Sequence, residues 1–466
     1  MKAMSIDPKE LHEQLLNVLQ KEDEVQLRAA LAGVEPAGVA EILELLEDVD
    51  RSRVIFALAS AAAAELITLL DERVRDEVVD DLPGDRLAEM VTEMSPDDAA
   101  DVVGELTTEE SNELLERLPV EQSEEIEQLL KYDENTAGGL MNPHVLSMPQ
   151  LHTVGEAIEY LRRADIDSEV FQIYTTDRDG RLSGTVLPQR LLISPAKKLI
   201  SDLMEPVPTD VTVEEDQEVV VHLFRKYDLT SMPVVDDDGK LVGHITVDDV
   251  LDVAAEEADE DIYHMAGTDA AELESSSTLR RSGIRLAFLL PSFVFLAGTA
   301  GVLLLARSYF DEGLLLAIIA FVPMIGALAG CCSVQTSTII TRGLATGEYA
   351  ATQVRLAFRR ESGIALVLAP CCAVIAWILV RFGMPVLLSN QEILDTGVSV
   401  TRIANAVGLG MLVGICAASI LGISMPFLFR RLGIDPAIAA GPIVTALNDV
   451  LCVTIYFALA HVVVNL

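Results

Sequence analysis

The sequence has little cysteine and only one tryptophan in 466 residues. The cysteines all lie in apolar stretches and lack metal-finger spacing, so neither a zinc finger nor a disulfide framework is expected. No glycine-rich phosphate loop and no nucleophile–base pair is visible, so the sequence predicts no enzyme. The six cysteines of the chain are Cys331, Cys332, Cys371, Cys372, Cys416 and Cys452.

Basic residues are also scarce, with 33 Lys and Arg against 73 Asp and Glu, a net charge of −40. Such a chain repels nucleic acid and attracts cations. The acids are unevenly spread, because only eight follow position 280. A boundary near Ser275 to Ser277 therefore separates a very acidic half from an apolar half. Met1 to Glu10 is charged and has no apolar core, so no signal peptide is expected.

The apolar half contains five stretches near or above the roughly 20 residues that cross a bilayer as a helix. They are Leu286–Ala306, Leu314–Ile340, Gly363–Phe382, Ile403–Phe429 and Ile438–Val464. These stretches predict a multi-pass membrane protein.

Arginines at the ends of these stretches predict the orientation. One side has Arg280, Arg281, Arg285, Arg342, Arg355, Arg359, Arg360, Arg430 and Arg431, and the other has Arg307, Arg381 and Arg402. The positive-inside rule places the N-terminal half in the cytoplasm. We expect the chain in the plasma or inner membrane.

Residues 1–132 alternate short apolar-periodic helices with proline-containing turns. Ser95 is predicted as an N-cap, followed by Pro96 at the first helical position. This region is expected to form an acidic helical superhelix.

The next stretch contains an internal repeat. Leu140-Met141-Asn142-Pro143 recurs as Leu203-Met204-Glu205-Pro206, and each copy continues into a β-rich run with an Asp-Gly turn and then a helix. These copies, 133–199 and 200–252, resemble CBS domains, which pair into modules that bind adenine nucleotides or ions. The resemblance implies that Thr246 and Asp249, spaced Thr-x-x-Asp, could hold the ribose of ATP.

Residues 253–278 are expected to form a connecting helix. From Val247 to Met265, apolar residues recur at spacings of three or four, and the opposite face is densely acidic. Like charges at this spacing weaken an isolated helix, so bound cations are one interpretation. A solvated linker helix is the other.

Within 279–466, the predicted pore domain, Asp449 lies well inside the fifth apolar stretch. A carboxylate at that depth costs about 3 kcal/mol to insert, which indicates a functional site. A protonated or helix-paired structural Asp is the alternative. Gly441-Pro442, one to two turns earlier, would free carbonyls toward a cavity. Asp435-Pro436 is typical of an N-cap, so both capping and ion binding are open for Asp435.

A run of small and polar residues, Gly330 to Thr338, lies in the second apolar stretch. Such residues either pack helices closely or line a water path. Gly410 and Gly414 in the fourth stretch favour helix packing.

The order of parts over nearly all 466 residues resembles the MgtE-type magnesium channels. Specific runs carry the resemblance: Tyr132…Ala137-Gly138-Gly139-Leu140-Met141, Val247-Asp248-Asp249-Val250-Leu251-Asp252-Val253, Arg342-Gly343-Leu344-Ala345-Thr346 and Arg430-Arg431-Leu432-Gly433…Asp435-Pro436-Ala437. The resemblance implies an α-helical domain of five spans per subunit, joined to an all-α superhelical domain and α/β tandem CBS domains.

It further implies a homodimer in membrane lipid, with Asp449 meeting a hydrated Mg²⁺ in a pore between subunits. The connecting helix would be a plug that closes when cytosolic Mg²⁺ bridges acidic surfaces. The implied sensing residues are Asp97, Asp101 and Gly139 between helical and CBS domains; Asp216, Glu218, Asp228, Asp249 and Asp252 in the CBS pair; and Glu257, Glu260 and Asp261 with Asp435 between plug and pore.

Several positions depart from the family pattern. Cys331, Cys332, Ser333 and Val334 precede Gln335 where Asn and Gly are expected; Gly441 replaces an Asn; and Arg225 replaces a small residue. Thiols near a pore would favour softer ions such as Co²⁺, Ni²⁺ or Zn²⁺, although buried cysteines also serve as packing residues. The sequence therefore predicts a Mg²⁺ channel, with a transition-metal channel or a nucleotide-sensing receptor as alternatives.

Overall fold

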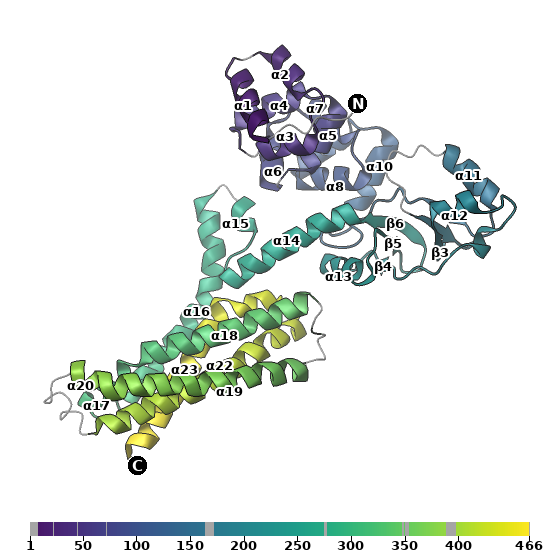
Figure 1. The fold of residues 1–466 in the computed structure, drawn as a ribbon. Coiled ribbons are helices and arrows are strands. Elements are labelled where there is room, and N and C mark those ends of the chain that lie inside the picture. The colour runs from purple at the N-terminus through teal and green to yellow at the C-terminus, as the bar shows by residue number, and fades with distance from the viewer. Residues whose placement is uncertain are drawn as a thin grey trace. The chain divides into compact units, whose positions relative to one another are not determined.

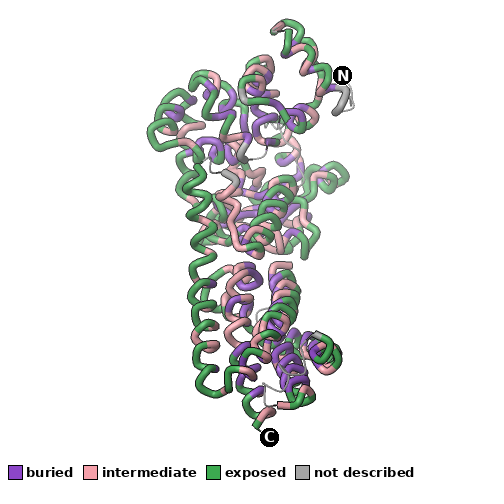
Figure 2. Tube along the Cα trace, turned by 90° about the vertical axis from the view of Figure 1, so that its left-hand side faces the viewer, coloured by how far each residue is buried: buried purple, intermediate pink, exposed green. Residues whose placement is uncertain are grey.

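The structure is a computed structural model that describes residues 8–21, 23–43, 45–70, 72–163, 172–274, 277–346, 349, 354–387 and 398–465. The chain divides into two compact units, Met1–Ala254 and Ala255–Leu466 (Figure 1). Each unit has its own hydrophobic interior, and Figure 2 shows the buried positions gathered there.

Short helices form the first part of the first unit. They are α1 (Pro8–Leu19), α2 (Glu24–Leu31), α3 (Pro36–Leu43), α4 (Asp48–Ala57), α5 (Ser60–Thr68), α6 (Glu72–Asp81), α7 (Gly84–Val91), α8 (Pro96–Glu105), α9 (Thr108–Leu115) and α10 (Val120–Leu129). Each of several helices packs on the next helix but one in the sequence: α1 packs on α3, α2 on α4 and α5 on α7. This packing confirms the predicted superhelix.

Ser95 is the N-cap of α8, and Pro96 is the first helical residue, as predicted. Its hydroxyl makes no capping bond to the helix backbone and instead lies 2.6 Å from Asp98 Oδ2, to which it donates.

Two three-stranded sheets follow, in the orders β1-β2-β3 and β4-β5-β6. In each, the first pair of strands is parallel and the second pair antiparallel, with a register shift at the same place in the antiparallel pair. The elements are β1 (Ser147–Pro149), α11 (Val154–Arg163), β2 (Ile173–Thr176), β3 (Leu182–Val186), α12 (Pro188–Ile193), η1 (Ile200–Asp202), β4 (Val211–Thr212), α13 (Gln217–Tyr227), β5 (Ser231–Val235), β6 (Leu241–Thr246) and α14 (Val247–Ala266). The internal repeat of the sequence is therefore a repeat of structure.

The two Asp-Gly turns of this repeat face each other. Gly180 and Gly239 have φ angles of 82° and 78°, which suit glycine. The carbonyl of Gly239 accepts from Leu182 N at 3.1 Å, and that of Gly180 accepts from Leu241 N at 3.2 Å. The turns thus join the two copies by a reciprocal pair of backbone bonds.

The first copy has a small core of its own, which includes Met148, Ile173 and Val186. The second copy shares one core with the helical domain, since Val234 and Ile245 belong to the same cluster as the buried side chains of α1–α10. Helix α14 begins at Val247, before the predicted connecting segment, and ends at Ala266, before that segment's predicted end at 278.

Among the described residues of the second unit, five helical segments are long and apolar enough to cross a membrane. Its elements are α15 (Ala271–Glu274), α16 (Thr278–Ala306), α17 (Glu312–Ile319), α18 (Val322–Ala345), α19 (Val354–Ile378), the π-helix η2 (Leu379–Gly383), α20 (Met384–Leu387), α22 (Val400–Arg431), the 3₁₀-helix η3 (Pro436–Ala440) and α23 (Pro442–Asn465). Helix α22 is central, because α18, α19 and α23 all pack on it. Helix α16 packs on α23 and otherwise exposes most of its side chains.

Two predicted spans differ in detail from the structure. The second is broken at Ala320–Phe321, between α17 and α18, and the fifth begins at Pro442. Placing 438–441 inside the fifth span was wrong, since these residues form the end of η3 and its C-cap.

Candidate functional site

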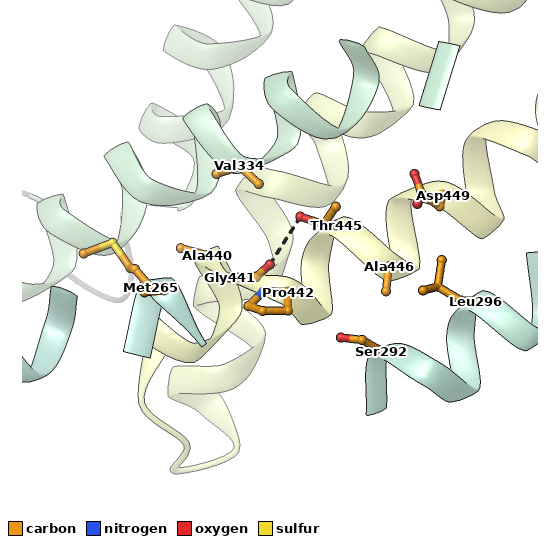
Figure 3. A pocket seen from close by; sticks show the side chains of 11 residues that line it. Met265, Ser292, Leu296, Val334, Ala440, Gly441, Pro442, Thr445, Ala446 and Asp449 are labelled. Carbon is orange, nitrogen blue, oxygen red and sulfur yellow. Dashed lines mark hydrogen bonds between the residues drawn. The ribbon is translucent and has the colours of Figure 1, made fainter. Parts of the chain in front are cut away.

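A cavity of about 400 Å³ lies within the second unit, and Asp449 is among the residues that line it. Its walls come from the end of α14 and from α16, α18, η3 and α23 (Figure 3). The lining residues are Met265, Ala266, Ser292, Leu296, Val334, Ala440, Gly441, Pro442, Thr445, Ala446 and Asp449. Asp449 therefore faces a space rather than a packed interface.

Small residues on α18 make room for the carboxyl-bearing face of α23. A Cβ built on Gly326 would lie 3.2 Å from Asp449 Oδ1, and one built on Gly330 would lie 3.7 Å from Asn448 Nδ2. A larger side chain at Gly326 would push against the carboxylate. The sequence interpretation included Gly330 but missed Gly326, which lies just before the polar run.

Gly441 lines the cavity beside the end of α14. A Cβ at this position would lie 2.9 Å from the carbonyl oxygen of Met265 and 3.2 Å from that of His264. The absence of an Asn side chain here thus has a steric reason, because the backbone of α14 occupies the space. Thr445 donates to the Gly441 carbonyl at 3.4 Å.

The polar run of the second span mainly packs helices. Ser337 donates to the carbonyl of Ala439 at 3.4 Å, Thr341 donates to that of Pro436 at 3.1 Å, and Ser333 donates within its own helix. Val334 lines the cavity, and none of the six cysteines, all of which are described, is among the lining residues. The close-packing interpretation therefore holds for most of the run.

Asp435 caps η3, as predicted, and also contacts a histidine that the sequence interpretation missed. Its Oδ1 accepts from Ala437 N at 2.8 Å, and its Oδ2 lies 2.5 Å from His264 Nδ1. The other ring nitrogen of His264 lies 3.4 Å from Asp269 Oδ2, and Glu260 Oε1 lies 3.8 Å from Nδ1. The sequence offered one signal for this contact, namely that His264 is the one histidine within the acidic helix.

The hydrogen bond to Asp435 raises the pKa of His264 to about 9, although burial acts in the opposite direction. His264 is consequently an imidazolium at neutral pH and supplies positive charge among Asp435, Glu260 and Asp261. The pKa of Asp261 rises to about 6, first through burial and then through the charges of Asp435 and Glu260. Glu257 is half-buried and Glu260 exposed.

A second set of acids gathers in the first unit, where α8 lies near the start of α14. Burial raises the pKa of Asp98 to about 6 and that of Asp249 to about 7, and in both cases the charges of Asp97 and Asp248 raise it further. Asp97 is buried and accepts from Asn142 Nδ2 at 3.1 Å. We call Asp97, Asp98, Asp248, Asp249 and Asp252 the α8–α14 acidic group.

The remaining predicted sensing residues lie around this group or apart from it. Burial, followed by the charge of Asp248, raises the pKa of the exposed Asp252, and Asp101 is exposed on α8. Gly139 is packed against the backbone of Asp133 and Glu134, where a Cβ would lie 2.6 Å from the Asp133 carbonyl oxygen.

Asp216, Glu218 and Asp228 are all exposed on α13. Asp216 is the N-cap and accepts from Glu218 N at 2.8 Å, whereas Asp228 is the left-handed C-cap with a φ of 52°. The helix between the caps has 11 residues, so the two cap residues are separated by about 18 Å. Asp216 and Asp228 of one chain therefore cannot share one ion. Arg225 lies in the last turn of the same helix.

Among the described residues, no group of three or more His, Cys, Asp or Glu side chains has an arrangement that could hold a metal ion. The acidic sites are thus not preassembled within the described part of a single chain.

Thr246 and Asp249 contact each other at the start of α14. Asp249 Oδ2 accepts from the Thr246 hydroxyl at 2.6 Å and from Thr246 N at 3.3 Å. The pair therefore caps the N-terminus of α14 in this structure, which is the usual structural role of Thr and Asp at such positions.

These features define a multi-pass membrane protein in which an acidic helical domain and a CBS pair accompany a helix bundle with a cavity-lining carboxylate. Family models agree: a divalent cation transporter model, MgtE, matches residues 322–459, the MgtE intracellular N domain matches 34–135, and the CBS domain matches 200–256. The chain belongs to the MgtE family of divalent cation transporters.

Relatives described as "Magnesium transporter MgtE" support this assignment. The one from Thermus thermophilus is 33% identical over 73% of this chain and 72% of its own length. The one from Enterococcus faecalis is 30% identical over 72% of this chain and 70% of its own length. A solved structure described as the cytosolic domain of the Mg²⁺ channel MgtE in complex with ATP is 35% identical, covers 52% of this chain and 99% of that chain, and has a TM-score of 0.49.

Proposed function

We propose that this chain forms a Mg²⁺ channel in which Asp449 interacts with the passing ion and cytosolic Mg²⁺ closes the path. The observation that carries the proposal is the position of Asp449 on a cavity inside the bundle of apolar helices. Inserting an acid at this depth in the membrane is costly, and such residues usually mark an ion or proton pathway. Membership in a family of divalent cation transporters favours an ion, rather than a proton, as the partner of Asp449.

The chemistry of the cavity favours a hard, hydrated cation. The polar side chains on its lining are Ser292, Thr445 and Asp449, all of which offer oxygen. Oxygen ligands suit Mg²⁺, whereas thiolates select softer metals. Since no cysteine is among the lining residues, the cavity does not favour the transition-metal alternative.

Gating would use the end of α14, whose residues Met265 and Ala266 line the cavity. Mg²⁺ can close the path only if it binds the closed arrangement better than the open one. Carboxylates of the α8–α14 acidic group, and those around Asp435, repel one another when Mg²⁺ is scarce. We propose Asp97, Asp101, Gly139, Asp249, Asp252, Asp216, Glu218, Asp228, Glu257, Glu260, Asp261 and Asp435 as sensing residues, completed in a homodimer.

The further proposals concern location and nucleotide. The arginine bias places the first unit in the cytoplasm, with the helix bundle in the plasma or inner membrane. ATP as a modulator stays a prediction that rests on Thr246 and Asp249, and binding there would have to replace their mutual hydrogen bond.

The test is Mg²⁺ entry into proteoliposomes containing the full chain or Asp449→Asn. Removing the negative charge should abolish entry or reduce it by at least about tenfold, because the ion loses a direct charge partner. Glu361→Gln is the matched control, since Glu361 is buried in α19 but is not among the cavity-lining residues. Its Mg²⁺ entry should stay near that of the wild type.

Millimolar Mg²⁺ on the side of the first unit should suppress wild-type entry. Entry that persists in Asp449→Asn would remove this residue from the path. A wild type that conducts no Mg²⁺ would refute the channel proposal and favour a receptor whose spans serve only as an anchor.

A further inference from the structure

Helix α16 lies outside the region matched by the divalent cation transporter model, yet it contributes a hydroxyl to the cavity. The buried residues of this 29-residue helix are Ser292 and Ala306. Ser292 is only 7% exposed, in a helix whose other side chains are mostly apolar and exposed. A spanning helix that buries a serine in its middle reverses the usual preference for apolar burial.

The Ser292 hydroxyl has no hydrogen-bond partner among the described residues. A buried hydroxyl without a partner carries a free-energy cost, and most such groups in proteins are bonded to protein or water. Ser292 lines the cavity together with Asp449 and Thr445, and Figure 3 shows it projecting from α16 toward the space bordered by α23. Thr445 already donates to the carbonyl of Gly441, whereas the Ser292 hydroxyl has no partner among the described residues.

The cavity is large enough for an ion that keeps its water. Its volume is about 400 Å³, and six water molecules occupy roughly 180 Å³ in the liquid. Mg²⁺ gives up its octahedral water shell reluctantly, so a site for it must hydrogen-bond that shell. Asp449 on α23 can accept hydrogen bonds from the shell, and a hydroxyl on α16 can accept from another part of it.

We infer that Ser292 is a positioning residue for the hydrated cation, and that it binds the ion's water shell while Asp449 binds it from α23. This inference rests on the proposed channel function and extends the ion path to α16. The role of Ser292 is to recognise the shell by hydrogen bonding, not to coordinate the metal directly.

The experiment uses Mg²⁺ entry into proteoliposomes and its block by hexaamminecobalt(III). The six ammines of this complex are octahedral hydrogen-bond donors that do not exchange, so it reports on shell recognition alone. In Ser292→Ala, the half-blocking concentration should rise about tenfold or more, as expected for one lost hydrogen bond to a charged species.

Thr299→Val is the matched control. Thr299 lies two turns along the same helix, and its buried hydroxyl also has no partner among the described residues, but it is not among the cavity-lining residues. Block of this variant should equal that of the wild type. Ser292→Thr, which keeps a hydroxyl, should restore most of the block.

The outcomes separate this inference from the proposed function. If the wild type conducts Mg²⁺ and Asp449→Asn does not, but Ser292→Ala and Thr299→Val show the same block as the wild type, the role of Ser292 is refuted and the channel stands. If the wild type conducts no Mg²⁺, the channel proposal fails, and the inference fails with it.

Discussion

Two glycines set the distance between the end of α14 and the start of α23. Gly267 has a φ of 82°, and a Cβ built on it would lie 2.5 Å from Cγ of Pro442. Gly441 faces the Met265 carbonyl at a distance that leaves no space for a side chain. The contact is therefore made by backbone atoms, and each methyl group added there must displace one of the two segments.

Gly441→Ala should weaken the suppression of Mg²⁺ entry by Mg²⁺ on the cytoplasmic side. Overpacking of this kind costs about 1–3 kcal/mol, so the Mg²⁺ concentration that halves entry should rise by about fivefold or more. The measurement is entry into proteoliposomes as a function of that concentration. Gly301→Ala on α16, where no atom lies within 4 Å of the added Cβ, is the control. Equal suppression in both variants would contradict the steric argument.

At the residue scale, chemistry that stands out from its surroundings could be predicted and steric detail could not. Asp449 is a charge among apolar residues, so the sequence was enough to single it out. Ser292 is a common small residue in an apolar helix, and only its burial without a partner gives it meaning. Gly441 was interpreted as the loss of an Asn ligand. Its steric role depends on the nearby carbonyl of Met265, a tertiary contact that the sequence does not reveal.

At the scale of elements, the end of α14 is held by an internal cation. His264 is protonated at neutral pH because the bond to Asp435 raises its pKa to about 9. Since this pKa lies above the usual value of 6.5, the pairing stabilises the contact fully below about pH 6.5 and is lost as the pH rises through about 9. The charge of His264 therefore takes part of the role that a metal ion would have between these carboxylates.

His264→Gln should make the end of α14 depend on Mg²⁺. Glutamine keeps a hydrogen bond to Asp435 but removes the positive charge, so Glu260, Asp261 and Asp435 repel without compensation. Hydrogen exchange of residues 262–267 in the full chain should accelerate by about tenfold without Mg²⁺ and should recover when Mg²⁺ is added. Asp259→Asn, an exposed change on the same helix, should leave exchange unaltered. If the exchange rate of His264→Gln were the same with and without Mg²⁺, no ion would be replacing the imidazolium.

The elements themselves followed well from sequence pattern. The repeated β-rich runs with Asp-Gly turns predicted the two strand-containing copies, and the apolar stretches predicted the spans. Hydropathy missed the break at Ala320–Phe321 because both residues are apolar, and it extended the fifth span across η3 because Ile438 to Ala440 are apolar too. The apolar face predicted on α14 was only partly buried: Leu251 and Ile262 are 65% and 58% exposed in the single chain.

At the scale of the whole molecule, charge and apolarity occupy different parts of the chain. The first unit carries most of the acids, and the second carries the spans and the arginines at their ends. The five candidate spans found in the described residues are an odd number, so the N-terminal unit and the C-terminus of helix α23 should lie on opposite sides of the membrane.

Tags at the two ends of the chain test this arrangement. External protease on intact cells should remove a tag placed after Leu466 and leave one placed before Met1, because the arginine bias holds the first unit inside. Both tags should be removed after lysis, which controls for tags that resist cleavage. Protection of both tags in intact cells would mean an even number of spans.

The division between the two compact units falls between Ala254 and Ala255, inside the continuous helix α14. A helix of 20 residues is a rod of about 30 Å whose backbone ladder resists twisting. Any turn of the rod about its axis at Val247 therefore reaches Met265 as the same angle. Successive side chains point about 100° apart around the axis, so a rotation of that size exchanges the residue that faces the cavity. In the proposed channel, the orientation of Met265 at the cavity would then be an angle that is set where the CBS fold ends.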